Sequence, residues 1–441
     1  TCVSIIIGTL SGCETLQPRA MGMKQYNEVG LIAIRGMLVS VLMLVPFVIF
    51  LVSNLEHTLV YWGGQDEVAS HLASRWINVY LLGLPSVLIF RTTQRFLACQ
   101  NIVMPCVYAA AIGSFIIHPL ILPYFVDQYG FMGSGLAISI SQWSICLFTL
   151  LYLKWKQPHE PQTWPLFHNN DYNNNDDDAC ISIRISRRWT YIKQAIIPMK
   201  PLLTYTRLSL GGVLSLSEWW FWESICFLVG RMGLVPLCVH TIAYQIIPLC
   251  WMLPLGVSIG ASVRIGTVLA LNDVPMAQRL AKFSLSIAVL LGAFVSTILY
   301  RHQSTIVALF TNDPDVILGC QQIWTRVCID VFILHIFCVQ AGILRALGLQ
   351  WTMATIIIIT LWGITLPTIL YYGQNDLQHI WTILPCGYSL LTLSLFGKII
   401  TVDWYQISND IVTSRQKSTT STSHTVVSLI MDTPTETTHL L

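Results

Sequence analysis

Charged side chains are scarce in this sequence: Asp, Glu, Lys and Arg make up 10% of 441 residues, against 54% hydrophobic residues and a mean hydropathy of +0.62. This scarcity excludes an ordinary soluble protein, and the long apolar runs predict a helical protein that crosses the membrane many times. The 24 Lys and Arg residues are dispersed along the chain. Binding to a phosphate backbone requires a compact basic patch, so we expect no nucleic-acid partner.

Motifs for metals and cofactors are also missing. The 13 cysteines stand singly, without a C-x-x-C pair, which excludes the usual disulfide frameworks and zinc sites. There is no His-x-x-x-His pattern, nucleotide loop or haem attachment motif, so we expect no metal and no cofactor. A cleavable signal peptide is absent too. Because the chain begins at Thr1, inside an apolar run, we expect it to be a fragment.

Apolar windows of about 20 residues are long enough to cross a bilayer as helices. They predict about eleven spans, at Cys2–Met21, Leu31–Ser53, His71–Leu97, Met104–Val126, Met132–Leu153, Leu208–Gly230, Val235–Val257, Leu280–Tyr300, Val316–Arg345, Trp351–Tyr372 and His379–Val402. The sequence therefore predicts an all-α polytopic membrane protein.

Lys and Arg concentrate in alternate connections, for example at Lys154 and Arg188, whereas the other connections hold acids such as Asp66 and Asp313. Under the positive-inside rule the first span then starts outside, and the C-terminus is cytoplasmic. A cytoplasmic N-terminus would require one more helix upstream, giving twelve. We expect the protein in the plasma membrane or a vacuolar or endosomal membrane.

An internal repeat is visible at an offset of 248 residues, which places Gly8 on Gly256 and Gly12 on Gly260. Repeated bundles are a transporter architecture. We predict two six-helix lobes, with these divisions: residues 1–154, an incomplete N-terminal lobe (helices 2–6); 155–206, a cytoplasmic linker with an Asn- and Asp-rich loop; 207–405, the C-terminal lobe (helices 7–12); 406–441, a disordered cytoplasmic tail.

Two carboxylates, Glu218 and Glu223, interrupt the apolar run Leu208–Gly230. A charge near the bilayer centre costs at least about 2.5 kcal/mol, so such residues indicate a functional site. Trp222 lies one helical turn after Glu218, and Trp219 lies one turn before Glu223. An acid beside an indole supplies the charge and the aromatic face that bind an organic cation. The alternative is a structural interhelical pair in which the tryptophans fill space.

Several stretches carry a resemblance to a known family. They are Gly8–Leu16 (GTLSGCETL), Gly22–Tyr26 (GMKQY), Glu218–Glu223 (EWWFWE), Pro254–Arg264 (PLGVSIGASVR) and Gly342–Gln350 (GILRALGLQ). In this order they resemble the eukaryotic branch of the multidrug and toxic compound extrusion (MATE) transporters, essentially over the whole chain. The first signature departs from the family at Pro18-Arg19-Ala20, where relatives usually carry Gln before a small residue. From the resemblance we expect the family's first helix and the outer part of its second to be absent from the sequence given.

The resemblance implies twelve helices in two lobes, alternating access, and export of organic cations in exchange for protons, or sodium in some members. It therefore implies a transporter and not an enzyme. Glu218 and Glu223 match two family carboxylates, and a third family acid falls on Gln245, which has lost the charge but keeps hydrogen-bonding groups. Tyr244 is expected to line the same cavity.

A fourth family acid falls at about Leu334. Asp330 lies one turn before it on the same face, and His335 follows it, so either side chain is a candidate substitute. Asp330 is also spaced i, i+4 from Arg326, which fits a private ion pair equally well. In the N-terminal lobe, Glu14 either lines the cavity or braces the loop through Lys24.

Two other functions remain open at this point. A lipid-linked saccharide flippase of the same superfamily would need a basic central cavity, whereas acids dominate here. A polytopic membrane enzyme would need paired catalytic groups at an interfacial loop, and Asp313 and Asp315 have no such partner nearby in the sequence. The partners that we expect are small organic cations, protons or sodium, and the lipid bilayer.

Overall fold

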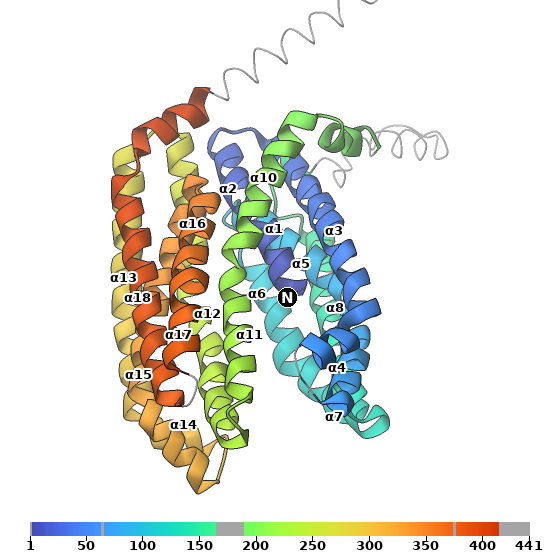
Figure 1. Ribbon diagram of the computed structural model, residues 1–441. Helices are drawn as coiled ribbons and strands as arrows, with labels where there is room; N and C mark the ends of the chain where they lie inside the picture. The colour runs from blue at the N-terminus through green and yellow to red at the C-terminus, as the bar shows by residue number, and fades with distance from the viewer. Residues whose placement is uncertain (1, 63–65, 165–188, 374–375, 414–441) are drawn as a thin grey trace, which may run out of the picture.

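The computed structural model describes residues 2–62, 66–164, 189–373 and 376–413, which are almost entirely α-helical (Figure 1). Within them, nine segments are long and apolar enough to cross a membrane. Their helices are α3 (Tyr26–His57), α4 (Glu67–Tyr80) with α5 (Leu84–Ala98), α6 (Met104–Ala111) with α7 (His118–Tyr129), α8 (Phe131–Lys156), α12 (Leu234–Ala270), α13 (Val274–Arg301), α15 (Pro314–Leu347), α16 (Gln350–Ile357) with α17 (Leu366–Tyr372), and α18 (Leu377–Thr401). A short helix, α14 (Gln303–Ala308), precedes α15. Nine of the predicted spans are confirmed.

The other two predicted spans are helices with a break near the middle. The first consists of α1 (Cys2–Thr9) and α2 (Ser11–Gly22), and the second of α10 (Met199–Ser215) and α11 (Ser217–Gly230). The backbone leaves regular α geometry at Leu10 (φ −76°, ψ −4°) and Leu216 (φ −86°, ψ 6°). The sequence predicted one continuous helix through Leu216. The break there instead places Glu218 in the first turn of a new helix, where the helix dipole favours a negative charge.

The helix α12 is longer than predicted. We predicted a span that ends at Val257, with the helix continuing toward Arg264; α12 is a 37-residue helix that ends at Ala270, with Pro248 and Pro254 inside it. Each interior proline removes one backbone hydrogen bond. Packing of α12 against α13, α15 and α2 keeps the helix continuous despite that cost.

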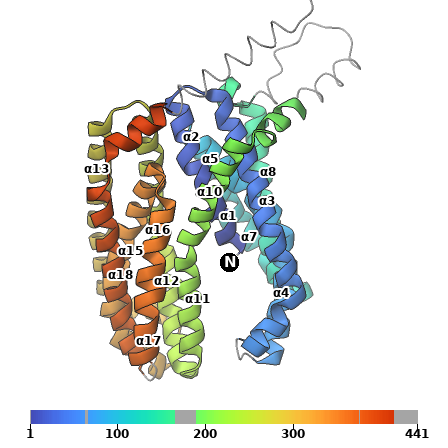
Figure 2. The same cartoon turned by 45° about the horizontal axis from the view of Figure 1, so that its top comes forward.

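The buried hydrophobic side chains form two main cores. One draws on residues 2–146 together with Tyr205 of α10, and the other draws on residues 221–411. Figures 1 and 2 show the corresponding bundles, α1–α8 and α11–α18, with α10 passing between them. We call these the N-lobe and the C-lobe. The helix α15 is the centre of the C-lobe, because 83% of its most apolar 18-residue window is buried.

Two of the predicted boundaries differ from the structure. The helix α10 begins at Met199, inside the segment that we assigned to the linker. Residues 404–413 are helical, so disorder does not begin at residue 406. This last helix is held in place because Ser408 donates to the Leu269 carbonyl (2.9 Å) and Trp404 is buried. The predicted Asn- and Asp-rich loop and the rest of the predicted tail lie outside the described residues.

Gly342 lies at a close approach of α15 to α12. A Cβ atom there would collide with the backbone and side-chain oxygens of Ser258, whereas a Cβ at Gly256 would meet nothing within 4 Å. Overpacking of this kind costs about 1–3 kcal/mol. We expect Gly342→Ala to lower the thermal unfolding temperature of the purified protein by several degrees, with Gly256→Ala unfolding like the wild type. Equal unfolding temperatures for both variants would contradict this packing.

Candidate functional site

Glu218 is the centre of a buried polar group in the C-lobe. Its side chain is 4% exposed, and its Oε1 accepts hydrogen bonds from the Trp222 indole (3.1 Å) and the Tyr388 hydroxyl (2.8 Å). The contact with Trp222 confirms the spacing of one helical turn. Tyr388 comes from α18, 170 residues further along the chain, and no sequence signal connected it to Glu218.

Aromatic rings enclose this carboxylate. The Trp222 ring lies 5.8 Å from Tyr388, 5.9 Å from Tyr244 and 6.1 Å from Trp381, measured between centroids. Phe337 of α15 contacts the Tyr388 ring at 6.1 Å. The predicted combination of an acid with aromatic walls is therefore present, and it is assembled from α11, α12, α15 and α18.

Asp330 lies in the same interior. It is completely buried on α15, and neither of its carboxylate oxygens has a hydrogen-bond partner among the described residues. Its carboxylate interacts electrostatically with Glu218, and both carboxylates interact electrostatically with the Tyr388 hydroxyl. Arg326 instead donates to the Gln322 carbonyl (2.6 Å), and in the described part of the chain it forms no ion pair with Asp330. The interpretation of Asp330 as half of a private ion pair is wrong.

The other predicted side chains lie in different places. Glu223 is exposed, and its carboxylate interacts electrostatically with the hydroxyl of the half-buried Tyr244. Trp219 is half-buried, and Gln245 is exposed. His335 is buried against α13, where its Nδ1 is 2.8 Å from the Val331 carbonyl. Glu218, Trp222, Tyr244 and Asp330 are thus brought together, whereas the structure does not place Glu223, Gln245 or His335 in hydrogen-bond contact with them.

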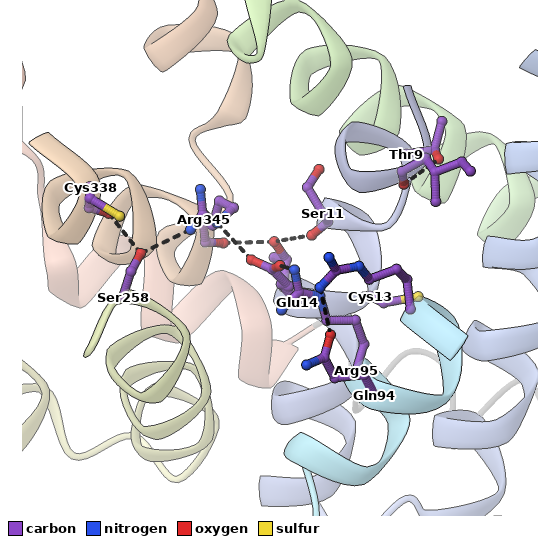
Figure 3. Close-up of polar contacts among 12 residues, drawn as sticks. Thr9, Ser11, Cys13, Glu14, Gln94, Arg95, Ser258, Cys338 and Arg345 are labelled. Carbon is purple, nitrogen blue, oxygen red and sulfur yellow. Dashed lines mark hydrogen bonds and ion pairs between the residues drawn. The ribbon is translucent and has the colours of Figure 1, made fainter. Parts of the chain in front are cut away.

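Glu14 belongs to a second polar site, between the lobes (Figure 3). Its Oε1 is 2.7 Å from Arg95 Nη2 of α5, and its Oε2 is 2.6 Å from Arg345 Nε of α15. The side chains of Glu14 and Arg95 are 6% and 7% exposed, and Arg345 is 14% exposed. Lys24 is exposed, and Glu14 pairs with the two arginines. The predicted brace through Lys24 is therefore wrong.

Further hydrogen bonds join the lobes around this ion pair. Thr15 donates to the Arg345 carbonyl (2.6 Å) and accepts from Gln350 Nε2 (2.6 Å), while Arg19 donates to the Ala346 carbonyl (2.8 Å). Arg345 also donates to Ser258 (3.0 Å). We call this group the inter-lobe network: Glu14, Thr15, Arg19, Arg95, Ser258, Arg345, Ala346 and Gln350. It lies about 22 Å from Asp330 along α15, at 1.5 Å per residue.

Two helical bundles, each with its own core, that meet through a buried polar network define a membrane transporter of the repeated-bundle class. The MatE family model matches two stretches of the sequence, residues 1–123 and 212–370. The chain therefore belongs to the MatE family, and it is a multi-pass membrane protein.

Sequence relatives and solved structures agree with this assignment. The chain is 26% identical over 410 residues to multidrug and toxin extrusion protein 1 from Homo sapiens. The aligned region covers 92% of this chain and 66% of that protein. It is 28% identical over 375 residues to the protein of that name from Danio rerio (83% and 58%). The chain spans about two thirds or less of the length of these relatives. The crystal structure of the eukaryotic MATE transporter AtDTX14 superposes with a TM-score of 0.80 at 18% identity, over 93% of this chain and 87% of that one.

Proposed function

We propose that this chain exports organic cations in exchange for protons. The observation that carries the proposal is the pair of buried carboxylates, Glu218 and Asp330, beside the rings of Trp222 and Tyr388. Such an arrangement offers an organic cation both a charge partner and an aromatic face. The names of the relatives, multidrug and toxin extrusion proteins, support a substrate of this class.

The two acids explain how protons and substrate compete. An ionised carboxylate that is buried without a cation beside it is costly, so each acid requires a bound proton or a bound cation. A cation arriving from one side takes the place of the protons, and protons arriving from the other side displace the cation. Coupling requires only this competition, provided that the two states of the transporter expose the site to opposite sides. Glu223, Trp219, Tyr244 and Gln245 then contact the cation as it enters and leaves.

The inter-lobe network supports an assignment of the conformational state. It joins the lobes at the end where α15 and α18 finish, and the distribution of Lys and Arg assigns that end to the cytoplasm. At the other end, Figure 1 shows α4 and α7 on one side of the molecule and α14 and α17 on the other. We therefore propose a state closed to the cytoplasm, with a cytoplasmic C-terminus, in the plasma membrane or a vacuolar or endosomal membrane.

The alternative functions fit the site less well. A flippase for lipid-linked saccharides needs cations around the pyrophosphate, but the C-lobe site is acidic. A membrane enzyme would need paired catalytic groups at an interfacial loop. Asp313 is instead the N-cap of α15, where its side chain accepts a hydrogen bond from the Asp315 amide (2.9 Å). A capping role accounts for Asp313 without catalysis.

Transport by reconstituted protein tests the proposal. Proteoliposomes with an acidic lumen are expected to accumulate a labelled organic cation from an alkaline medium, and Glu218→Gln is expected to reduce this uptake at least tenfold, which corresponds to about 1.4 kcal/mol. Glu67→Gln, an exposed acid on α4, is the matched control and should transport normally. Uptake driven by a sodium gradient but not by a pH gradient would show that sodium is the coupling ion. No uptake under either gradient would contradict the proposed function.

A further inference from the structure

A pocket of about 560 Å³ lies in the C-lobe, away from the inter-lobe network. It is formed where α11 ends and where α12, α15 and α18 begin. Arg231, Asp315 and Asp376 give its mouth a polar, charged lining, and Val239 and Ile323, each 1% exposed, form its inner wall. All of its lining residues belong to the C-lobe. It is therefore distinct from any space between the lobes, and in the proposed orientation it opens to the outer side.

Two buried polar side chains are neighbours of lining residues on the same helices. His240 follows Val239 on α12, and Trp381 lies one turn beyond Leu377 of the pocket on α18. Both are completely buried, and within the described residues neither ring nitrogen of His240 nor the indole nitrogen of Trp381 has a hydrogen-bond partner. Buried polar groups without partners are rare in folded proteins and call for an explanation in ligand binding or chemistry.

A continuous set of ring contacts leads from this pair to Trp222, the hydrogen-bond donor to Glu218. The His240 ring is 5.5 Å from Trp381 and 6.2 Å from Tyr244. Trp381 contacts Trp222, which donates to Glu218. Tyr244, on the same helix, is thus the ionisable group in ring contact with His240. Glu218 and Glu223 of α11 interact electrostatically with Tyr244, Asp330 of α15 interacts with Glu218, and the charged residues of the pocket mouth lie on the other side.

We propose that this pocket is the outer access route for the coupling protons and that His240 carries them toward Glu218 and Asp330. This inference rests on the proposed function. Imidazole accepts a proton on one nitrogen and releases the proton from the other, and it does so near neutral pH more readily than any other side chain. The proton released by His240 protonates a carboxylate, the O–H bond forms, and the organic cation loses its charge partner. Protons would thus reach the site from inside the C-lobe, separately from the path of the substrate.

Two transport assays separate this role from packing. The first is uptake driven by a pH gradient, and the second is counterflow, in which labelled and unlabelled cation exchange at equal pH without net proton movement. His240→Phe keeps the ring and removes its nitrogens, whereas His240→Gln keeps hydrogen bonding without proton transfer. We expect both variants to lose at least tenfold in gradient-driven uptake and to stay within about twofold of the wild type in counterflow. Unchanged gradient-driven uptake, or equal loss in both assays, would overturn the inference.

Blocking the pocket provides an independent test. Leu318 lines the pocket and is 56% exposed, so Leu318→Cys offers a site for a charged, membrane-impermeant thiol reagent added from the outer side. Labelling is expected to slow gradient-driven uptake and to spare counterflow, with the equally treated wild type as the control for the natural cysteines. A labelled variant that behaves like the wild type, or that loses counterflow to the same extent, would exclude the pocket as a separate proton route. Absence of both activities in the wild type would instead contradict the proposed function.

Discussion

Glu14→Gln is expected to open the inter-lobe network and to reduce gradient-driven transport at least tenfold. The glutamate forms ion pairs with both Arg95 of the N-lobe and Arg345 of the C-lobe, at distances of 2.7 and 2.6 Å. Removing one partner from a buried ion pair typically costs about 3–5 kcal/mol, because the remaining charge stays buried without compensation. That cost falls on the state in which the two lobes are joined at this end. The population should therefore shift away from this state. Transport requires the protein to pass through both states, so the transport rate should fall.

Natural cysteines report on this shift. Cys13 and Cys99, at most 2% exposed, line a narrow cavity beside Glu14 that is bounded by both lobes. Their modification by a membrane-permeant maleimide, followed by mass spectrometry, should be faster in Glu14→Gln than in the wild type, whereas the exposed Cys386 should react at the same rate in both.

Glu28→Gln provides the matched control. It removes a salt bridge to Arg35 (3.0 Å) that lies within α3 and does not join the lobes, and Glu28 is 43% exposed. Transport and cysteine reactivity should both remain near the wild-type values. Equal maleimide rates in Glu14→Gln and the wild type would show that the ion pair does not hold this end closed.

The sequence predicted the spans and the acid of the C-lobe because both depend on local patterns. A bilayer requires continuous apolar segments, and Glu218 with Trp222 is a contact between residues four positions apart on one helix. The break at Leu216 was missed because no proline or glycine stands at that position. The sequence also could not show that Leu216 separates α10, whose Tyr205 packs in the N-lobe core, from α11 of the C-lobe.

The errors concern contacts between distant parts of the chain. For Glu14 we chose Lys24 as the partner because it is near in sequence, but two arginines 81 and 331 positions further along the chain, Arg95 and Arg345, are its partners in the folded protein. The alternative that paired Arg326 with Asp330 likewise rested on helical spacing alone, and Arg326 instead donates to the Gln322 carbonyl one turn earlier on its own helix. Tyr388 and His240 carried no signal at all, since an isolated Tyr or His in an apolar span is ordinary until its neighbours are known. Tertiary packing decides these pairings.

Asp330→Asn is expected to abolish most gradient-driven uptake, to about the same extent as Glu218→Gln. The amide preserves the volume of the side chain in a fully buried position, so the main change is the loss of a group that takes up a proton or faces a cation. Both acids interact electrostatically with Tyr388 and with one another, so they should function as a unit. Groups that act as a unit show strongly non-additive effects. The double variant Glu218→Gln/Asp330→Asn should therefore transport about as poorly as either single variant.

The measurement is uptake by all three variants under the same pH gradient, with Asp127→Asn, an exposed acid of the N-lobe, as the control that should transport normally. Binding of the labelled cation at fixed pH distinguishes two ways in which Asp330 acts. If it binds the cation directly, Asp330→Asn weakens binding as well as transport. If it only carries protons, binding persists while the dependence of binding on pH becomes shallower, because one titrating group fewer competes with the cation. Full uptake by Asp330→Asn would show that Glu218 couples protons to the substrate without a second buried acid in the C-lobe.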